Sequence, residues 1–277
     1  MSVEQKGSRL IPPQKESLLK RVSFHEMRNA QPCQAKLGDI ILDLEKALKS
    51  PPDNEAVLLY HPARIINAIL TRKALEKNVA LKFGFESLIS PAIELASAVY
   101  REQKDTFSLL GTFNSLIDKL GVDTIRKDTV AEKKDELKIQ AFTTERAGLA
   151  VDHLRTLTND ESVLFIAFAN GGTAPGLWNF IEYVRQTGQN SSVFFPVRFE
   201  HSLHDRLPKI SESDKIDLKE TAKEKQIVAY NDHLESGYTM RVGIPYLREI
   251  VFGRCGEERR FPRIFPLAND PLRLRCL

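Results

Sequence analysis

Cysteine is scarce in this chain of 277 residues, and long apolar runs are missing. The three cysteines, Cys33, Cys255 and Cys276, are far apart and odd in number, which excludes the disulfide framework of a small secreted protein. They have no histidine partners at zinc-ligand spacing. No apolar run approaches the roughly 20 residues that span a bilayer, and residues 1–21 contain no apolar core of the signal-peptide kind. We therefore expect a cytoplasmic globular protein with no membrane partner.

A charge excess of one sign is also missing. Lys and Arg total 40 and Asp and Glu total 37, which gives a formal net charge of +3. This balance argues against nucleic acid as the partner. The exception is segment 241–277, which has eight Arg, four acidic residues and no Lys. Because Arg binds phosphate through paired hydrogen bonds, the segment suits an anionic substrate or RNA, although an ordinary salt-bridged surface has the same composition.

The chain divides into three parts of different composition. Residues 1–35 are polar and rich in Pro and Gln, and we expect a partly ordered arm. In residues 36–139 apolar side chains recur at helical spacing, which predicts a helical domain. The expected helices cover 37–48, 61–76, 90–100 (capped by Ser90 before Pro91) and 107–120, and the charge-rich residues 127–138 form an exposed helix or linker. We interpret the isolated His61, before Pro62, as structural.

Residues 140–277 alternate between strand and helix patterns. The expected elements are a helix over 145–157, a buried strand over 163–169, a Gly-rich loop over 170–176 with a helix to Gly188, a strand over 193–199, a polar stretch over 200–223, a strand over 226–230 and a helix from 239 to about 251. Such alternation predicts an α/β fold, with a parallel twisted sheet flanked by helices. Ligands of such sheets bind beyond the carboxyl ends of the strands.

The loop after the strand 226–230 has the residue types of a ribose-phosphate site. Asn231 and Asp232 follow the strand end, where they suit the vicinal hydroxyls of a ribose. The backbone amides of 235–239, at the start of a helix, suit a phosphate. Ser236 and Thr239 add hydroxyl donors, and Gly237 permits a close approach of the backbone.

This segment resembles the phosphoribosyl-pyrophosphate (PRPP) loop of the type I phosphoribosyltransferases. The family pattern is four apolar residues, two acids, two apolar residues, Asp, Thr or Ser, Gly, any residue, and Thr. Here it reads Ile227-Val-Ala-Tyr-Asn231-Asp232-His233-Leu234-Glu235-Ser236-Gly237-Tyr238-Thr239. The resemblance covers about residues 140–277.

The resemblance implies a fold, a reaction and a set of site residues. Mg²⁺ would accompany PRPP, with Asp232 on the ribose and so indirectly at the metal, and Glu235 as general acid/base. The pyrophosphate loop would be Asn170, Gly171, Gly172 and Thr173, whose amides meet the leaving group; the mobile flap would lie within 200–223, with Arg206 and Lys209, and Arg198 is a further cation at a strand end. Tyr238 is placed to stack on a base, as is Trp178, although Trp178 is expected in the core. A homodimer is also expected.

Three hypotheses follow for the function. The first is a phosphoribosyltransferase that releases pyrophosphate. The second is a non-catalytic protein of the same fold that binds PRPP or a nucleotide; it is favoured because Asn231 replaces the first acid of the family pattern and Asn170 stands where a Lys or Arg is common. The third is a methyltransferase that uses residues 170–176 as its glycine loop, which leaves 231–239 without a role.

Overall fold

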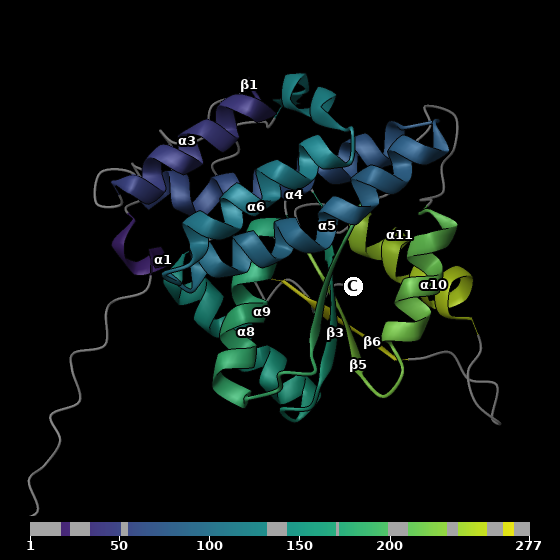
Figure 1. Cartoon of the computed structure of the whole chain (residues 1–277). Helices are drawn as coiled ribbons and strands as arrows, with labels where there is room; N and C mark the ends of the chain where they lie inside the picture. The colour runs from purple at the N-terminus through teal and green to yellow at the C-terminus, as the bar shows by residue number, and fades with distance from the viewer. Residues whose placement is uncertain are drawn as a thin grey trace, which may run out of the picture.

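The computed structural model describes residues 18–22, 34–50, 55–131, 143–169, 172–198, 210–231, 238–253 and 263–268 (Figure 1). The described elements of the N-terminal half are α1 (Leu18–Arg21), β1 (Gln34–Lys36), α3 (Leu37–Lys49), α4 (Glu55–Leu75), α5 (Val79–Tyr100), α6 (Thr106–Lys119), the 3₁₀ helix η2 (Asp123–Lys127) and β2 (Thr129–Ala131). Within the arm, Leu18, Leu19 and Val22 are buried.

Helices α3 and α6 confirm their predictions, but α4 and α5 correct theirs. Helix α4 begins at Glu55 instead of residue 61 and continues through Pro62. Helix α5 is one continuous helix across Pro91, so the predicted cap at Ser90 is wrong. Its cap is Asn78, whose side-chain Oδ1 accepts hydrogen bonds from the amides of Ala80 at 3.0 Å and Leu81 at 3.2 Å. Both helices tolerate an interior proline because buried packing outweighs one lost backbone hydrogen bond.

The segment 127–138 also differs from its prediction. Residues 129–131 form strand β2, which pairs antiparallel with β1, and residues 132–142 lie outside the described residues. The pairing brings Lys36 opposite Thr129, about 90 residues later in the chain. Only a tertiary contact decides such a short strand, because three residues carry almost no periodic signal.

The C-terminal half has the predicted α/β fold. Its described elements are α8 (Thr144–Thr158), β3 (Val163–Phe168), α9 (Thr173–Thr187), β4 (Val193–Val197), α10 (Glu212–Thr221), β5 (Gln226–Tyr230), α11 (Tyr238–Tyr246), the π-helix η3 (Leu247–Phe252) and β6 (Ile264–Leu267). The four strands β3 to β6 form one parallel sheet in the order β4-β3-β5-β6. The central position of β3 and the edge position of β4, with its Pro196, agree with the sequence predictions.

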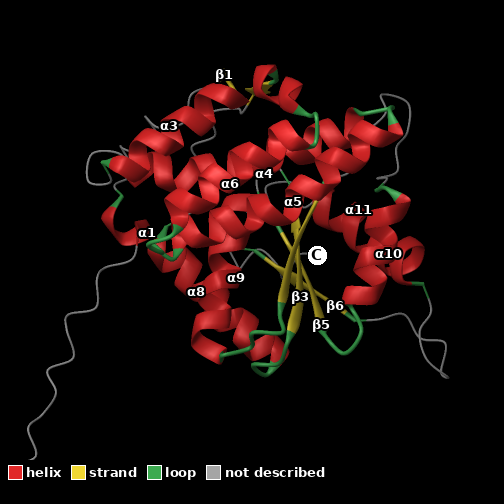
Figure 2. Cartoon of the chain, viewed as in Figure 1, coloured by secondary structure: helices red, strands yellow, loops and turns green. Residues whose placement is uncertain are grey.

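Helices cover both faces of the sheet (Figure 2). Side chains of β3 alternate between the faces, as a strand requires. Phe165 packs in the same apolar cluster as α8 and α9, and Leu164, Ile166 and Phe168 pack with α10, α11 and η3. Every residue of β3 is buried, which explains its continuous apolar sequence.

The described part of the polar stretch 200–223, residues 210–223, contains a helix. Residues 212–221 form α10, which Ser211 caps by accepting a hydrogen bond from the Asp214 amide at 3.1 Å. The helix has one fully buried residue, Leu218, against the sheet. One apolar contact per ten residues gives a weak helical pattern, and for that reason the sequence reads as polar throughout.

The helical half packs against α9 and shares an apolar core with one face of the sheet. A single apolar cluster contains residues of α3, α4, α5 and α6 together with α8, α9 and one face of the sheet. Rings of Tyr100 in α5 and Trp178 in α9 lie 5.7 Å apart across this contact, and Trp178 is in the core as predicted. The predicted division at 36–139 and 140–277 therefore runs through a shared core.

Candidate functional site at the carboxyl edge of the sheet

The strand order creates a switch point between β3 and β5. The chain leaves β3 toward β4 on one side, and leaves β5 toward β6 on the other. The helices that follow these two strands, α9 and α11, cover opposite faces. In open parallel sheets ligands bind at this point, beyond the carboxyl ends of the two strands. Both loops predicted from the sequence, after β3 and after β5, start here.

The end of the loop after β3 is held tightly against the strands. Asn170 and Gly171 lie outside the described residues, whereas Gly172 and Thr173 lie inside them. The Gly172 amide donates to the Phe168 carbonyl oxygen at 3.0 Å. A Cβ atom at Gly172 would lie 2.6 Å from this oxygen and 3.3 Å from the backbone carbonyl oxygen of Tyr230, so only glycine fits. Because the Gly172 amide already donates to Phe168, it is not available to a pyrophosphate. The predicted pyrophosphate contact therefore rests on the amides of residues 171 and 173.

The hydroxyl of Thr173 points to the helical half. Thr173 is the first residue of α9 and is fully buried. Its Oγ1 donates to Oδ1 of Asn67 in α4 at 2.6 Å, across 106 residues of sequence. This buried bond connects the predicted pyrophosphate loop to α4.

The loop after β5 begins at Asn231. Asn231 is partly exposed, and its backbone N–H donates to the backbone carbonyl oxygen of Leu267 in β6 at 3.2 Å. Asp232, Glu235, Ser236 and Gly237 lie outside the described residues. Tyr238 and Thr239 open α11, as the phosphate-binding interpretation requires, and their side chains are also outside the described part.

One predicted cation is described at the same edge. Arg198 follows directly after β4, the neighbour of β3, and is half-buried. Burial lowers the pKa of its guanidinium, which nevertheless keeps its charge at neutral pH. A desolvated guanidinium attracts an anion more strongly than an exposed one. Arg206 and Lys209 lie outside the described residues.

Helix α4 contains buried polar residues, among them His61, which the sequence predicts to be structural, and Arg64 and Asn67, which the sequence interpretation does not identify. His61, Arg64 and Asn67 are spaced by three and share one side of α4. Their exposed fractions are 3%, 1% and 6%. Burial, with a smaller effect of Arg64, lowers the pKa of His61 to about 4. In the sequence, these three polar residues recur every three positions among the apolar residues of α4, and this spacing is the signal that could have identified them. Polar side chains are seldom fully buried unless they have a polar partner.

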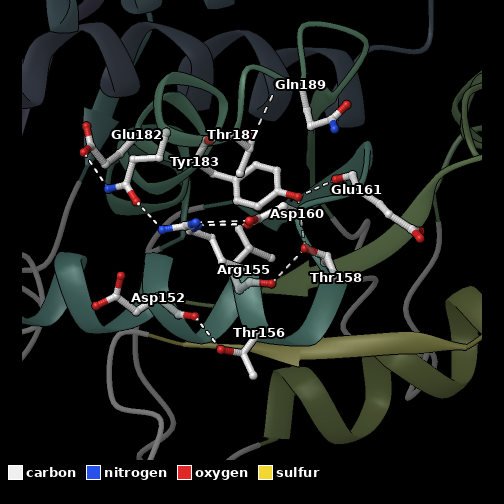
Figure 3. Close-up of polar contacts among 12 residues, drawn as sticks. Asp152, Arg155, Thr156, Thr158, Asp160, Glu161, Glu182, Tyr183, Thr187 and Gln189 are labelled. Atoms are coloured by element: carbon white, nitrogen blue, oxygen red, sulfur yellow. Dashed lines mark hydrogen bonds and ion pairs between the residues drawn. The ribbon is translucent and has the colours of Figure 1, made fainter.

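The opposite, amino edge of the sheet has a structural polar network (Figure 3). The Tyr183 hydroxyl of α9 donates to the backbone carbonyl oxygen of Glu161 and lies 3.0 Å from Thr158 Oγ1. Arg155 holds Asp160 through two hydrogen bonds of 2.9 and 3.0 Å. These contacts fasten the turn between α8 and β3, far from the predicted loops.

The described residues contain no group of three or more His, Cys, Asp and Glu side chains arranged to hold a metal ion. Among the helices of the described ranges, none is both long and apolar enough to cross a membrane. Comparison of the chain with protein-family models, curated proteins and solved structures finds no match. The functional inference therefore rests on the residues and their geometry.

Proposed function

We propose that this protein binds PRPP, or a nucleotide with a ribose 5-phosphate, at the switch point between β3 and β5. In the leading form of the proposal it transfers the phosphoribosyl group to a nitrogenous base and releases pyrophosphate. The observation that carries the proposal is the position of Asn231: it directly follows the buried parallel strand β5, and α11 begins seven residues later at Tyr238. The PRPP-loop pattern needs this strand–loop–helix context to be meaningful.

The neighbouring loop supports the same ligand. Gly172 and Thr173 end the loop after the adjacent strand β3, so a diphosphate between the loops would reach both. Arg198 supplies positive charge at the end of β4. A ligand with a diphosphate beside a diol matches the order of Arg198, Gly172 and Asn231 at the ends of β4, β3 and β5.

The reaction assigns a role to each residue. The ribose hydroxyls bind Asn231 and Asp232, and the amides of 235–239 bind the 5-phosphate. Mg²⁺ enters with the diphosphate as part of the substrate. The C1–O bond to pyrophosphate breaks while a C1–N bond to the base forms, and Glu235 accepts the proton of the base. Arg198 stabilises the charge that develops on the leaving pyrophosphate.

A second candidate is a non-catalytic sensor of the same ligand. The Asn231 side chain can hydrogen-bond a ribose hydroxyl, but it brings no negative charge to the Mg²⁺-bound substrate. This favours a protein that binds the ligand without turning it over. The direct contact of the helical half with α9 gives such a sensor a route to a partner surface.

Calorimetric titration of Mg²⁺-PRPP tests the binding. We expect the wild type to bind and the double variant Asp232→Ala, Thr239→Ala to lose binding. The matched control is Asp152→Ala, Thr156→Ala, because this pair is exposed on α8 at the amino edge (Figure 3). Equal affinity of both double variants, or no binding to the folded wild type, contradicts the proposal.

A pyrophosphate-release assay with a panel of nitrogenous bases then separates the two candidates. Release that depends on a base and disappears in Asp232→Ala identifies a transferase. Binding without release for every base identifies the sensor. Binding of a phosphate-free methyl donor instead of PRPP supports the methyltransferase hypothesis.

A further inference from the structure

Helix α4 crosses the carboxyl edge of the sheet from one face to the other (Figure 1). At Asn67 it contacts Thr173 of α9, which belongs to one face. At Lys73 it contacts Asp214 of α10, which covers the opposite face, through an Nζ to Oδ1 distance of 2.6 Å. Six residues of helix span about 9 Å. A helix that contacts the helices on both faces of the sheet within so short a length passes over the ends of the strands.

One buried and two partly buried polar contacts hold the crossing. The Lys73 side chain is 4% exposed and also pairs with Glu86 of α5 at 3.0 Å. The Asn67–Thr173 bond is 2.6 Å long and buried on both sides. Buried polar bonds fix one geometry, because any displacement leaves desolvated partners unsatisfied.

The Asn67 bond acts on the loop that ends at Thr173. Gly172 is fixed from the strand side by its bond to Phe168, and the Gly176 amide donates to the Gly172 oxygen at 2.9 Å. Thr173 is held from the opposite side by its hydrogen bond to Asn67 of α4. The first turn of α9 is therefore held between the sheet and α4. The orientation of this turn determines where the backbone amides that follow Gly171 point.

We propose that Asn67 is a positioning residue, through which the helical half sets the geometry of the ligand loop after β3. The effect on PRPP rests on the proposed function; the effect on the loop does not. The helical half is then part of the ligand site and not a separate domain attached to it.

Variants on both sides of the bond test the inference. Asn67→Ala and Thr173→Val remove the acceptor and the donor, respectively. Thr173→Ser keeps the hydroxyl. We expect each of the first two to weaken Mg²⁺-PRPP binding at least tenfold in calorimetry, the double variant to be no weaker than the worse single one, and Thr173→Ser to bind within twofold of the wild type.

Tyr183→Phe is the control for a mere loss of stability. It removes a buried hydroxyl from the same helix α9, but at the amino edge (Figure 3). We expect it to lower stability in urea while PRPP affinity stays within twofold of the wild type. If Asn67→Ala and Thr173→Val bind like the wild type, or lose no more affinity than Tyr183→Phe, the inference is overturned.

Hydrogen exchange without ligand separates this inference from the proposed function. If the wild type does not bind PRPP, the proposed function fails, and the amides of Gly172, Thr173, Ala174 and Gly176 then decide the role of Asn67. Exchange at least tenfold faster in Asn67→Ala than in the wild type, with Thr173→Ser unchanged, supports the positioning role. Unchanged exchange of these amides in Asn67→Ala overturns it.

Discussion

Protonation of the buried His61 should lower the free energy of unfolding of this protein in acid. A solvent-exposed histidine has nearly the same pKa in the folded and unfolded states and would not have this effect. His61 lies in α4 and is only 3% exposed. Its buried Nδ1 has no hydrogen-bond partner among the described residues. Burial, followed by the charge of Arg64, lowers its pKa from 6.5 to about 4, and Asp43 opposes this shift. The folded protein therefore holds His61 neutral where the unfolded chain protonates it.

The sign and size of the effect follow from linkage. Between pH 6.5 and 4 the unfolded state binds a proton that the native state excludes, so stability present above pH 6.5 is lost as the pH falls toward 4. With these two pKa values, the loss attributable to His61 is about 2 kcal/mol at pH 5 and about 3 kcal/mol at pH 4, relative to pH 7.5.

Urea unfolding at several pH values measures this loss. The single tryptophan, Trp178, lies in the core and reports on it by fluorescence. We expect His61→Gln to show a pH 7.5-to-5 decrease in stability about 2 kcal/mol smaller than that of the wild type. The control is Gly148→Ala on α8, which changes no titratable group and should keep the decrease of the wild type. Identical pH dependence in His61→Gln and the wild type would refute the reasoning.

Three further predictions concern other contacts. Gly172→Ala should cost about 1–3 kcal/mol in urea unfolding and weaken PRPP binding, because its Cβ collides with backbone oxygen; Gly148→Ala, where a Cβ meets nothing, should instead stabilise by about 0.5–1 kcal/mol. Lys73→Ala should cost about 2–3 kcal/mol in the same assay, because two partly buried carboxylates lose their cation, and a loss below about 0.5 kcal/mol contradicts this. Tyr183→Phe should cost about 1 kcal/mol, and an unchanged urea midpoint shows that the network does not stabilise the fold.

The elements of the C-terminal half could be predicted from local patterns. The unbroken apolar run of β3 indicates burial on both faces, and the structure places β3 between two neighbours. Gly188 ends α9 in the left-handed conformation, with φ of 72°. Pro196 marks an edge strand because proline cannot complete a central ladder. In each case a few adjacent residues contain the whole physical cause.

The candidate site was predictable only in part. The sequence indicates that loops follow β3 and β5, and the parallel sheet brings Gly172, Arg198 and Asn231 to one edge. The roles of Asp232 and Glu235 stay predictions. Asn67 could not be assigned, because a polar residue in a helix gives no local sign of its partner.

By itself, the amino-acid sequence determined the helix and strand periods, the α/β class and the positions of the two Gly-bearing loops, because these depend on short-range spacing. Only the tertiary structure decided that α4 begins at Glu55, that α5 runs through Pro91 and that the helical half lies across the carboxyl edge. Those outcomes depend on contacts such as Asn67 to Thr173, 106 residues apart, whose energy appears only when the whole chain is packed.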